Sequence, residues 1–124
     1  MDGALQGVAQ GQAREIYEFD VPESLRNELV KESVGMQKLR GNDEVEATKR
    51  AHGDSVRLAF ELVKLSLIEV DGRRLKRGDG EDETVWNNME PMLRQLLLAA
   101  YAELHTPDDK VTENFLKARR IKVG

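Results

Sequence analysis

A short segment near the middle of the chain constrains the fold most strongly. Residues 67–75 read Leu-Ile-Glu-Val-Asp-Gly-Arg-Arg-Leu, with the Asp71-Gly72 pair between two short flanking runs. An Asp-Gly pair favours the two positive-φ positions of a type I′ turn, which joins the strands of tight β-hairpins. The sequence therefore predicts a small antiparallel hairpin, and any fold of this chain must accommodate at least that pair of strands.

A further strand is predicted near the start of the chain. In residues 14–21 the apolar side chains of Tyr17, Phe19 and Val21 alternate with polar ones, and Pro22 follows. Alternation with aromatic and β-branched residues is typical of a half-buried strand, and proline ends it. We predict a strand over these residues.

Residues 24–40 support two interpretations. Leu25, Leu29 and Met36 fit helical spacing, but Val34-Gly35 interrupts that pattern. The alternative is a second strand near residues 29–34.

Helix signals dominate the chain after Gly41. Capping residues, a proline in a first turn and apolar positions three or four apart all recur there. They predict a polar helix over about 43–52, capped by Asn42 or Asp43, and an apolar helix after a cap at Asp54 or Ser55. A short helix capped by Thr84 and a long helix from Pro91 to about Leu104 are predicted next. A last helix, opened by Thr106-Pro107, carries Val111, Phe115 and Leu116.

Composition limits the chain to one modest core. It has 124 residues, of which 40% are hydrophobic and 34% charged, and only six are aromatic. A chain of this size buries roughly two-thirds of the surface that it exposes when unfolded, which is enough for one domain. We predict an α+β, mostly α fold with four to five helices, a small β-hairpin and short terminal strands. Residues 1–13 are expected to form a flexible N-terminal arm, and residues 14–124 a single α-rich domain.

Several function classes are not expected. The absence of cysteine excludes disulfides and thiol chemistry. The longest apolar run, residues 96–102, is far short of the roughly 20 residues of a membrane span. The first residues lack the basic and apolar regions of a signal peptide, so we expect a cytoplasmic protein. A net charge of −4 gives no general reason to expect nucleic-acid binding.

No pattern of an active site or cofactor site stands out. His52 and His105 are far apart in sequence, and we expect structural roles for both. If a calcium-binding loop is counted from Asp79, its position 12 is Glu90, as required, but its position 6 is Thr84, where glycine is needed. A solvated loop is therefore expected over residues 79–83. The carboxylates of Glu61 and Glu69 are expected on solvated faces, without the desolvated pair that acid–base catalysis needs. We expect no enzyme, no cofactor and no metal.

An interface role is the remaining expectation. Trp and Met are enriched at protein interfaces, although a tryptophan in an aromatic-poor chain more often fills the core. Two basic segments, residues 73–77 and 117–122, are candidates for contact with phosphates or acidic partners, and the first is expected to be neutralised by the acids beside it. The candidate interface residues are Trp86, Met89, Met92, Arg119, Arg120, Ile121, Lys122 and Val123.

The layout of the chain resembles a known family. The resemblance rests on the aromatic strand that ends at Pro22, the Val70-Asp71-Gly72 turn, Trp86 before an apolar helix that ends in Ala-Tyr-Ala-Glu-Leu-His, and Thr106-Pro107 before a closing helix with Asn114-Phe115-Leu116. In this order over residues 14–123 the chain is similar to the small tail assembly chaperones and related tail-assembly proteins of tailed bacteriophages and phage-like particles.

The resemblance implies a non-enzymatic protein that binds the tape-measure protein or other tail proteins, in the host cytoplasm or the virion. A homo-oligomer is an open alternative, because the sequence does not determine the oligomeric state. Two alternatives for the function also stay open. The first is a structural subunit retained in the tail, baseplate or neck of the particle. The second is a small nucleic-acid-binding regulator.

Overall fold

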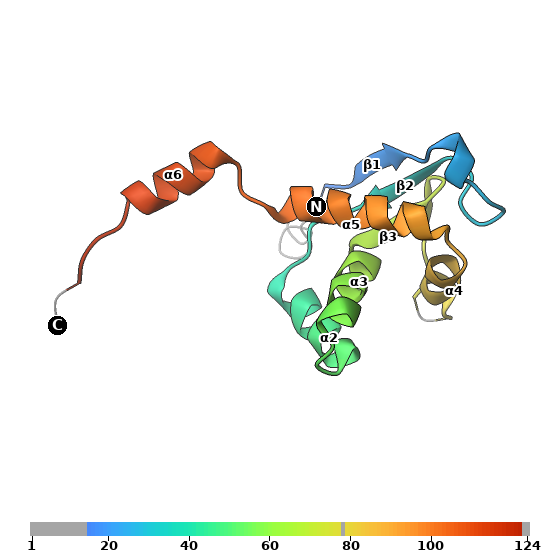
Figure 1. Ribbon diagram of the computed structural model, residues 1–124, viewed down its shortest axis with the longest axis horizontal. Helices are drawn as coiled ribbons and strands as arrows, with labels where there is room; N and C mark the ends of the chain where they lie inside the picture. Colours follow the sequence, from blue (N-terminus) through green and yellow to red (C-terminus); the bar gives the residue numbers. More distant parts are fainter. Residues whose placement is uncertain (1–14, 78, 123–124) are drawn as a thin grey trace, which may run out of the picture.

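The structure, a computed structural model, describes residues 15–77 and 79–122. Its centre is a four-stranded antiparallel sheet in the order β1-β2-β3-β4 (Figure 1). The strands are β1 (Tyr17–Asp20), β2 (Ser33–Met36), β3 (Leu67–Val70) and β4 (Arg73–Arg74). The predicted N-terminal arm, residues 1–13, lies outside the described residues.

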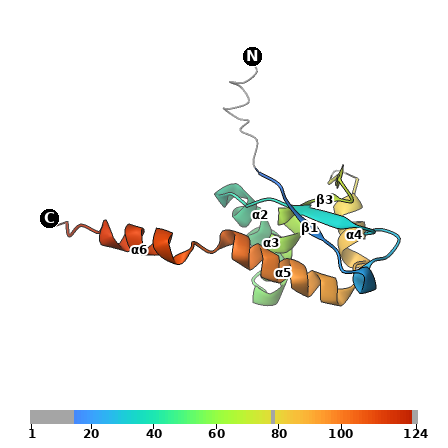
Figure 2. The same ribbon diagram turned by 90° about the horizontal axis from the view of Figure 1, so that it is seen from above.

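Five α-helices accompany the sheet in the described part of the chain. They are α2 (Gly41–Ala51), α3 (Ser55–Ser66), α4 (Glu81–Asn87), α5 (Pro91–His105) and α6 (Asp109–Lys117), with a 3-10 turn, η1 (Glu23–Leu25), after β1. Helices α3 and α5 lie on the same side of the sheet (Figure 2). The predicted α+β class is thus confirmed.

The core lies between the sheet and these helices. In the strand register Phe19 is paired with Val34 and Val34 with Val70, so apolar side chains follow one face of the sheet. Because β2 is a central strand, all four of its residues are buried. The buried cluster comprises Val21, Leu25, Val30, Val34, Met36, Val63, Leu67, Val70, Leu75, Val85, Trp86, Met89, Leu93 and Leu97.

The predicted hairpin is confirmed. Asp71 and Gly72 have φ angles of 54° and 79°, as a type I′ turn requires. The Asp71 carboxylate also accepts hydrogen bonds from the backbone N–H groups of Lys31 (3.0 Å), Glu32 (2.6 Å) and Ser33 (3.1 Å). The turn residue therefore fixes the start of β2, about forty residues earlier in the chain.

The ambiguous segment 24–40 contains a strand, a few residues later than predicted. β2 begins at Ser33, because Asn27 folds the preceding residues into a turn in which its Oδ1 accepts from the N–H groups of Leu29 and Val30. Gly35 fits β2 because a Cβ there would come within 3.0 Å of side-chain atoms of Ile16 and Glu69. The glycine that seemed to interrupt a helix is thus required by the sheet.

The cap at Asp54 is confirmed, whereas three other predicted helix starts were wrong. The Asp54 side chain accepts hydrogen bonds from the N–H groups of Val56 and Arg57. Helix α2 begins at Gly41, and Asp43 lies inside its first turn, where its carboxylate accepts from the Arg40 N–H at 3.0 Å. The predicted caps Asn42 and Asp43 are therefore both helical residues.

Thr84 does not cap α4, which begins three residues earlier. The Glu81 carboxylate accepts from the Lys76 N–H at 2.8 Å and pairs with Arg73, and these contacts hold the helix start at Glu81. Likewise, Thr106 ends α5 by donating its hydroxyl to the Ala102 carbonyl at 2.6 Å. Asp108 instead caps α6, since its side chain accepts from the Val111 N–H at 2.8 Å.

Candidate protein interface

Helix α6 projects from the rest of the described molecule. In both views it continues beyond the end of α5 and lies away from the sheet (Figures 1 and 2). Its apolar side chains Val111, Phe115 and Leu116 are exposed, and Phe115 is 77% exposed. Together with Pro107 and Thr112 they line one apolar surface, which we call the α6 face. An amphipathic helix normally buries such a face against another element.

The helix leaves the body at a fixed point. We use the term body for β1–β4 and α2–α5. At the end of α5, His105 Nε2 accepts the Leu39 N–H at 2.8 Å, and its Nδ1 lies 2.8 Å from the Tyr101 carbonyl. Since Nε2 is the acceptor, the neutral ring carries its proton on Nδ1 and donates it to Tyr101. The ring also stacks on Tyr101 with centroids 4.0 Å apart, so His105 holds the base of α6.

His105 thus has the structural role that the sequence predicted. His52 also serves the backbone, because it ends α2 in the left-handed conformation with a φ of 52°.

The C-terminal segment follows α6 as an exposed, basic stretch. Arg119, Arg120, Ile121 and Lys122 form no strand in the structure, and Ile121 is 88% exposed. Residues 114–122 include four basic side chains and no acidic one. Val123, the last predicted interface residue, lies outside the described residues. The exposure of residues 119–122 is compatible with an interface.

The body carries an apolar hollow between β1 and α5, which we call the β1–α5 groove. It consists of two adjoining depressions of about 240 and 290 Å³ that share Phe19 and Ala100. Each depression is smaller than a usual small-molecule site of roughly 300–1,000 Å³. Apolar residues line most of it; the complete lining is Tyr17, Glu18, Phe19, Asp20, Val21, Pro22, Val34, Leu93, Leu96, Leu97, Ala100, Glu103 and Leu104.

The rim of this groove is acidic. The exposed acids Asp20 and Glu103 line it, whereas the Glu18 carboxylate accepts from the Ser33 hydroxyl at 3.2 Å. At one end Lys38 lies over the Tyr17 ring, 5.9 Å from its centroid. The Tyr17 hydroxyl donates to Glu15 Oε1 at 2.8 Å, and this bond raises the pKa of Tyr17. The groove is thus apolar at its floor and negatively charged at its edge.

The three predicted apolar interface residues lie in different environments. Trp86 and Met89 are buried in the core, where 6% and 3% of their surface is exposed. Arg94 donates to the Trp86 carbonyl at 2.9 Å and lies over the indole ring. Trp86 therefore fills the core, as the sequence favoured for a tryptophan in an aromatic-poor chain, and neither Trp86 nor Met89 offers a large exposed surface. Met92 is 65% exposed, one helical turn before the groove residue Leu96.

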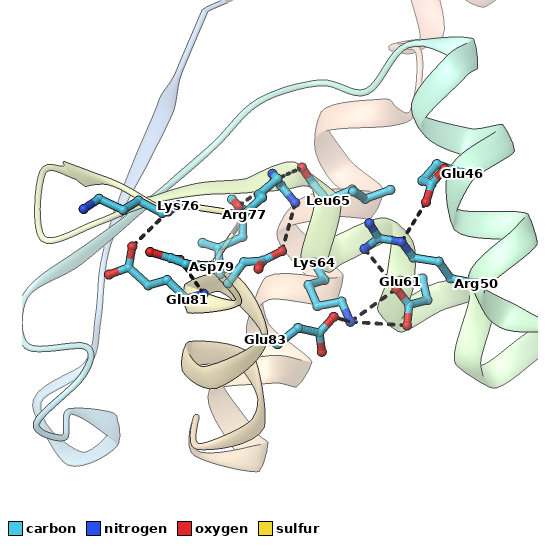
Figure 3. Close-up of polar contacts among 12 residues, drawn as sticks. Glu46, Arg50, Glu61, Lys64, Leu65, Lys76, Arg77, Asp79, Glu81 and Glu83 are labelled. Carbon is cyan, nitrogen blue, oxygen red and sulfur yellow. Dashed lines mark hydrogen bonds and ion pairs between the residues drawn. The ribbon is translucent and has the colours of Figure 1, made fainter.

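An ionic network with buried Glu61 and Lys64 at its centre joins α2, α3 and α4 (Figure 3). Lys64 Nζ lies 2.7 Å from Glu83 Oε2 and 3.3 Å from Glu61, and Arg50 lies 3.8 Å from Glu61. Both Glu61 and Lys64 are buried, so the predicted solvated position of Glu61 was wrong. The sequence signal was the (i, i+3) spacing of these two residues, which alone does not distinguish a surface pair from a buried one. Each carboxylate of the network lies near a cation, and these ion pairs connect the three helices.

Two acids of the segment 79–83 pair with the basic segment before it, as predicted, whereas Glu83 pairs with Lys64. The predicted solvated loop was wrong, because residues 81–83 form the first turn of α4 and Asp82 is buried. Arg73 pairs with Glu81, and Arg77 Nη1 lies 3.4 Å from Asp82 Oδ2. The hydrogen bond from the Lys76 N–H, together with Arg73, lowers the pKa of Glu81. Arg77 also donates to the carbonyl of Leu65 at 2.8 Å, and burial lowers its pKa. Within residues 15–77 and 79–122, acids and histidines form no cluster of three suited to a metal ion.

Comparison with known protein families, curated proteins and solved structures finds no match to this chain. No helix in the part of the chain that the structure describes has the length and apolar character needed to cross a membrane.

Proposed function

We propose that this protein is a non-enzymatic assembly factor of tailed bacteriophages or phage-like particles, which acts by docking α6 on another protein subunit. The observation that carries the docking role is the exposed α6 face on a helix that projects from the body. The phage-tail context comes from the resemblance of the chain layout to tail assembly chaperones.

A helix of nine residues such as α6 has little stability in water by itself, because nucleation is unfavourable and few backbone hydrogen bonds follow it. Burial of its apolar face against a partner would supply the missing stabilisation. Phe115 is the natural anchor, since aromatic residues seated in pockets contribute much of the binding energy of protein interfaces.

A capture experiment tests this function. Tagged protein is incubated with lysate of the source, and the co-purifying proteins are identified by mass spectrometry. We expect a long helical tape-measure protein or tail subunits, and we expect them to be lost with Phe115→Asp. The matched control is Val45→Asp, which places the same charge at an exposed valine of α2.

Two outcomes would contradict the proposal. Equal capture of tail proteins by the wild type and by Phe115→Asp would show that α6 does not bind them. Recovery of DNA alone, released by moderate salt, would favour the nucleic-acid-binding alternative through Arg119, Arg120 and Lys122, because phosphate contacts weaken steeply with salt.

A further inference from the structure

We infer that the β1–α5 groove of one molecule receives α6 of a second copy of this chain. This inference rests on the proposed function, because it names the partner of the helix that the function assigns to docking. Three properties of the groove and the helix match: their apolar surfaces, their lengths and their charges.

The apolar surfaces are complementary in kind. The groove floor presents Phe19, Leu96 and Ala100, and the α6 face presents Val111, Phe115 and Leu116. In the described chain both surfaces are open to solvent, and Leu96 is 45% exposed. Docking one on the other would remove both from water, which is the main driving force of protein association.

The lengths also agree. Helix α6 has nine residues and is ~14 Å long at 1.5 Å per residue. Along α5 the groove runs from Leu93 to Leu104, a distance of ~17 Å by the same measure. The groove therefore accommodates the whole of α6.

The charges decide which partner fits. Asp20 and Glu103 give the groove an acidic rim. Helix α6 carries both signs, Asp109 and Glu113 against Lys110 and Lys117, and the net positive charge lies in the segment after it, at Arg119, Arg120 and Lys122. A second copy therefore brings a basic segment directly after the apolar face. Complementary charge of this kind steers association and suppresses wrong partners.

A molecule's own α6 does not fill its groove in the structure. Only Thr106–Asp108 connect α5 and α6, and both views show α6 continuing away from the body. To enter its own groove, α6 would have to reverse direction beside α5. Docking between copies needs no such reversal and leaves the His105 anchor intact.

Sedimentation velocity on single and mixed variants tests the inference. The helix variant is Phe115→Asp and the groove variant is Leu96→Asp. We expect the average mass of the wild-type protein to rise with its concentration. Each variant should raise the dissociation constant of self-association by about 30-fold or more, as for an interface hot spot. Val45→Asp should associate like wild type. An equimolar mixture of the two variants should recover a 1:1 complex, because one retains its groove and the other its helix.

Exposed charges give a second test that does not place a charge on an apolar surface. Asp20→Lys/Glu103→Lys and Arg119→Glu/Arg120→Glu should each weaken association by about tenfold. Mixing these two proteins should restore it, since the altered groove then faces the altered tail.

Three results would overturn the inference. They are a wild-type chain that stays monomeric at every concentration, a Leu96→Asp variant that associates like wild type, and a mixture of Phe115→Asp and Leu96→Asp that fails to form a complex. A monomeric chain that still captured a tail protein through Phe115 would overturn self-docking and leave the assembly function standing. Self-association without any captured tail protein would support the inference and contradict the assembly function.

Discussion

Trp86 and Phe115 are both large aromatic residues on helices, yet 6% of Trp86 is exposed and 77% of Phe115. Trp86 packs near Phe60, with ring centroids 5.7 Å apart, and lies beneath Arg94. Phe115 lies on a helix that projects from the body (Figure 1). The core is thus complete within residues 15–105, and the apolar side chains of α6 stay exposed.

The same contrast holds for charged residues. Lys64 is a buried member of the ionic network of three helices, whereas the Lys117–Glu113 pair lies 3.3 Å apart on exposed side chains of α6. Ion pairs on the surface contribute little, while removal of one member of a buried pair leaves an uncompensated charge.

The largest difference should come from the two aromatic residues. We expect Trp86→Ala to lower the free energy of unfolding by about 3–5 kcal/mol, because it opens a cavity in the core. Phe115→Ala should change it by about 0.5 kcal/mol or less at low protein concentration, where no copy covers the helix. Urea denaturation followed by circular dichroism measures both. Equal losses would mean that α6 packs on its own body.

The two lysines should differ somewhat less. Lys64→Met should cost about 3 kcal/mol, since the buried Glu61 carboxylate loses its nearest cation. Lys117→Met should cost less than about 0.5 kcal/mol. The double variant Lys64→Met/Glu61→Gln should recover part of the loss. Arg57 also lies 4.0 Å from Glu61, so a small effect of Lys64→Met would show that Arg50 and Arg57 compensate this carboxylate without Lys64.

Asp71 provides a pH-dependent test of the body. Burial acts to raise the pKa of this carboxyl, but the hydrogen bonds from the N–H groups of Lys31, Glu32 and Ser33 outweigh it and lower the pKa. The stabilisation is therefore fully present above the ordinary value of 3.8 and is lost as the pH falls through the folded-state pKa.

We expect Asp71→Asn to lower the free energy of unfolding by about 1 kcal/mol at neutral pH, because asparagine keeps the turn but not the charge-assisted hydrogen bonds. Unfolding measured across the acid range should show the two proteins converging below pH 3.8. A difference that stayed constant with pH would contradict the role of the carboxylate.

Asp108 should give the smallest change in global stability. Asp108→Ala removes the N-cap of α6 and should destabilise that helix by about 1 kcal/mol, but leave the unfolding of the body unchanged. Backbone chemical shifts of residues 109–117 report the local loss of helix. A lower unfolding midpoint for the body would show that α6 and the body unfold together.

Local signals made much of this fold predictable. Asp71-Gly72 and Asp54 determine their turn and cap by bonds within a few residues, so the hairpin and α3 could be predicted from the sequence. The start of α4 could not, because it depends on contacts of Glu81 with Arg73 and Lys76 that only the folded loop brings together. Gly35 likewise reflects close packing against Ile16 and Glu69.

The candidate interface was predictable only in part. Apolar spacing identified Val111, Phe115 and Leu116 as one helix face, but spacing does not reveal whether a face meets its own core or another molecule. For the same reason the sequence could not separate Trp86, which completes the core, from Met92, which is exposed. The β1–α5 groove is formed by segments about eighty residues apart, so no short pattern in the sequence could predict it.

Hydrogen exchange of the α6 amides at increasing protein concentration tests the central claim most directly. At low concentration we expect residues 109–117 to exchange fast while α3 and α5 remain protected, because the body is stable without α6. As concentration rises, protection should appear in α6 and along β1 and α5 around the groove, and Phe115→Asp should abolish this gain. Full protection of α6 at the lowest concentration, or none at the highest, would contradict the account.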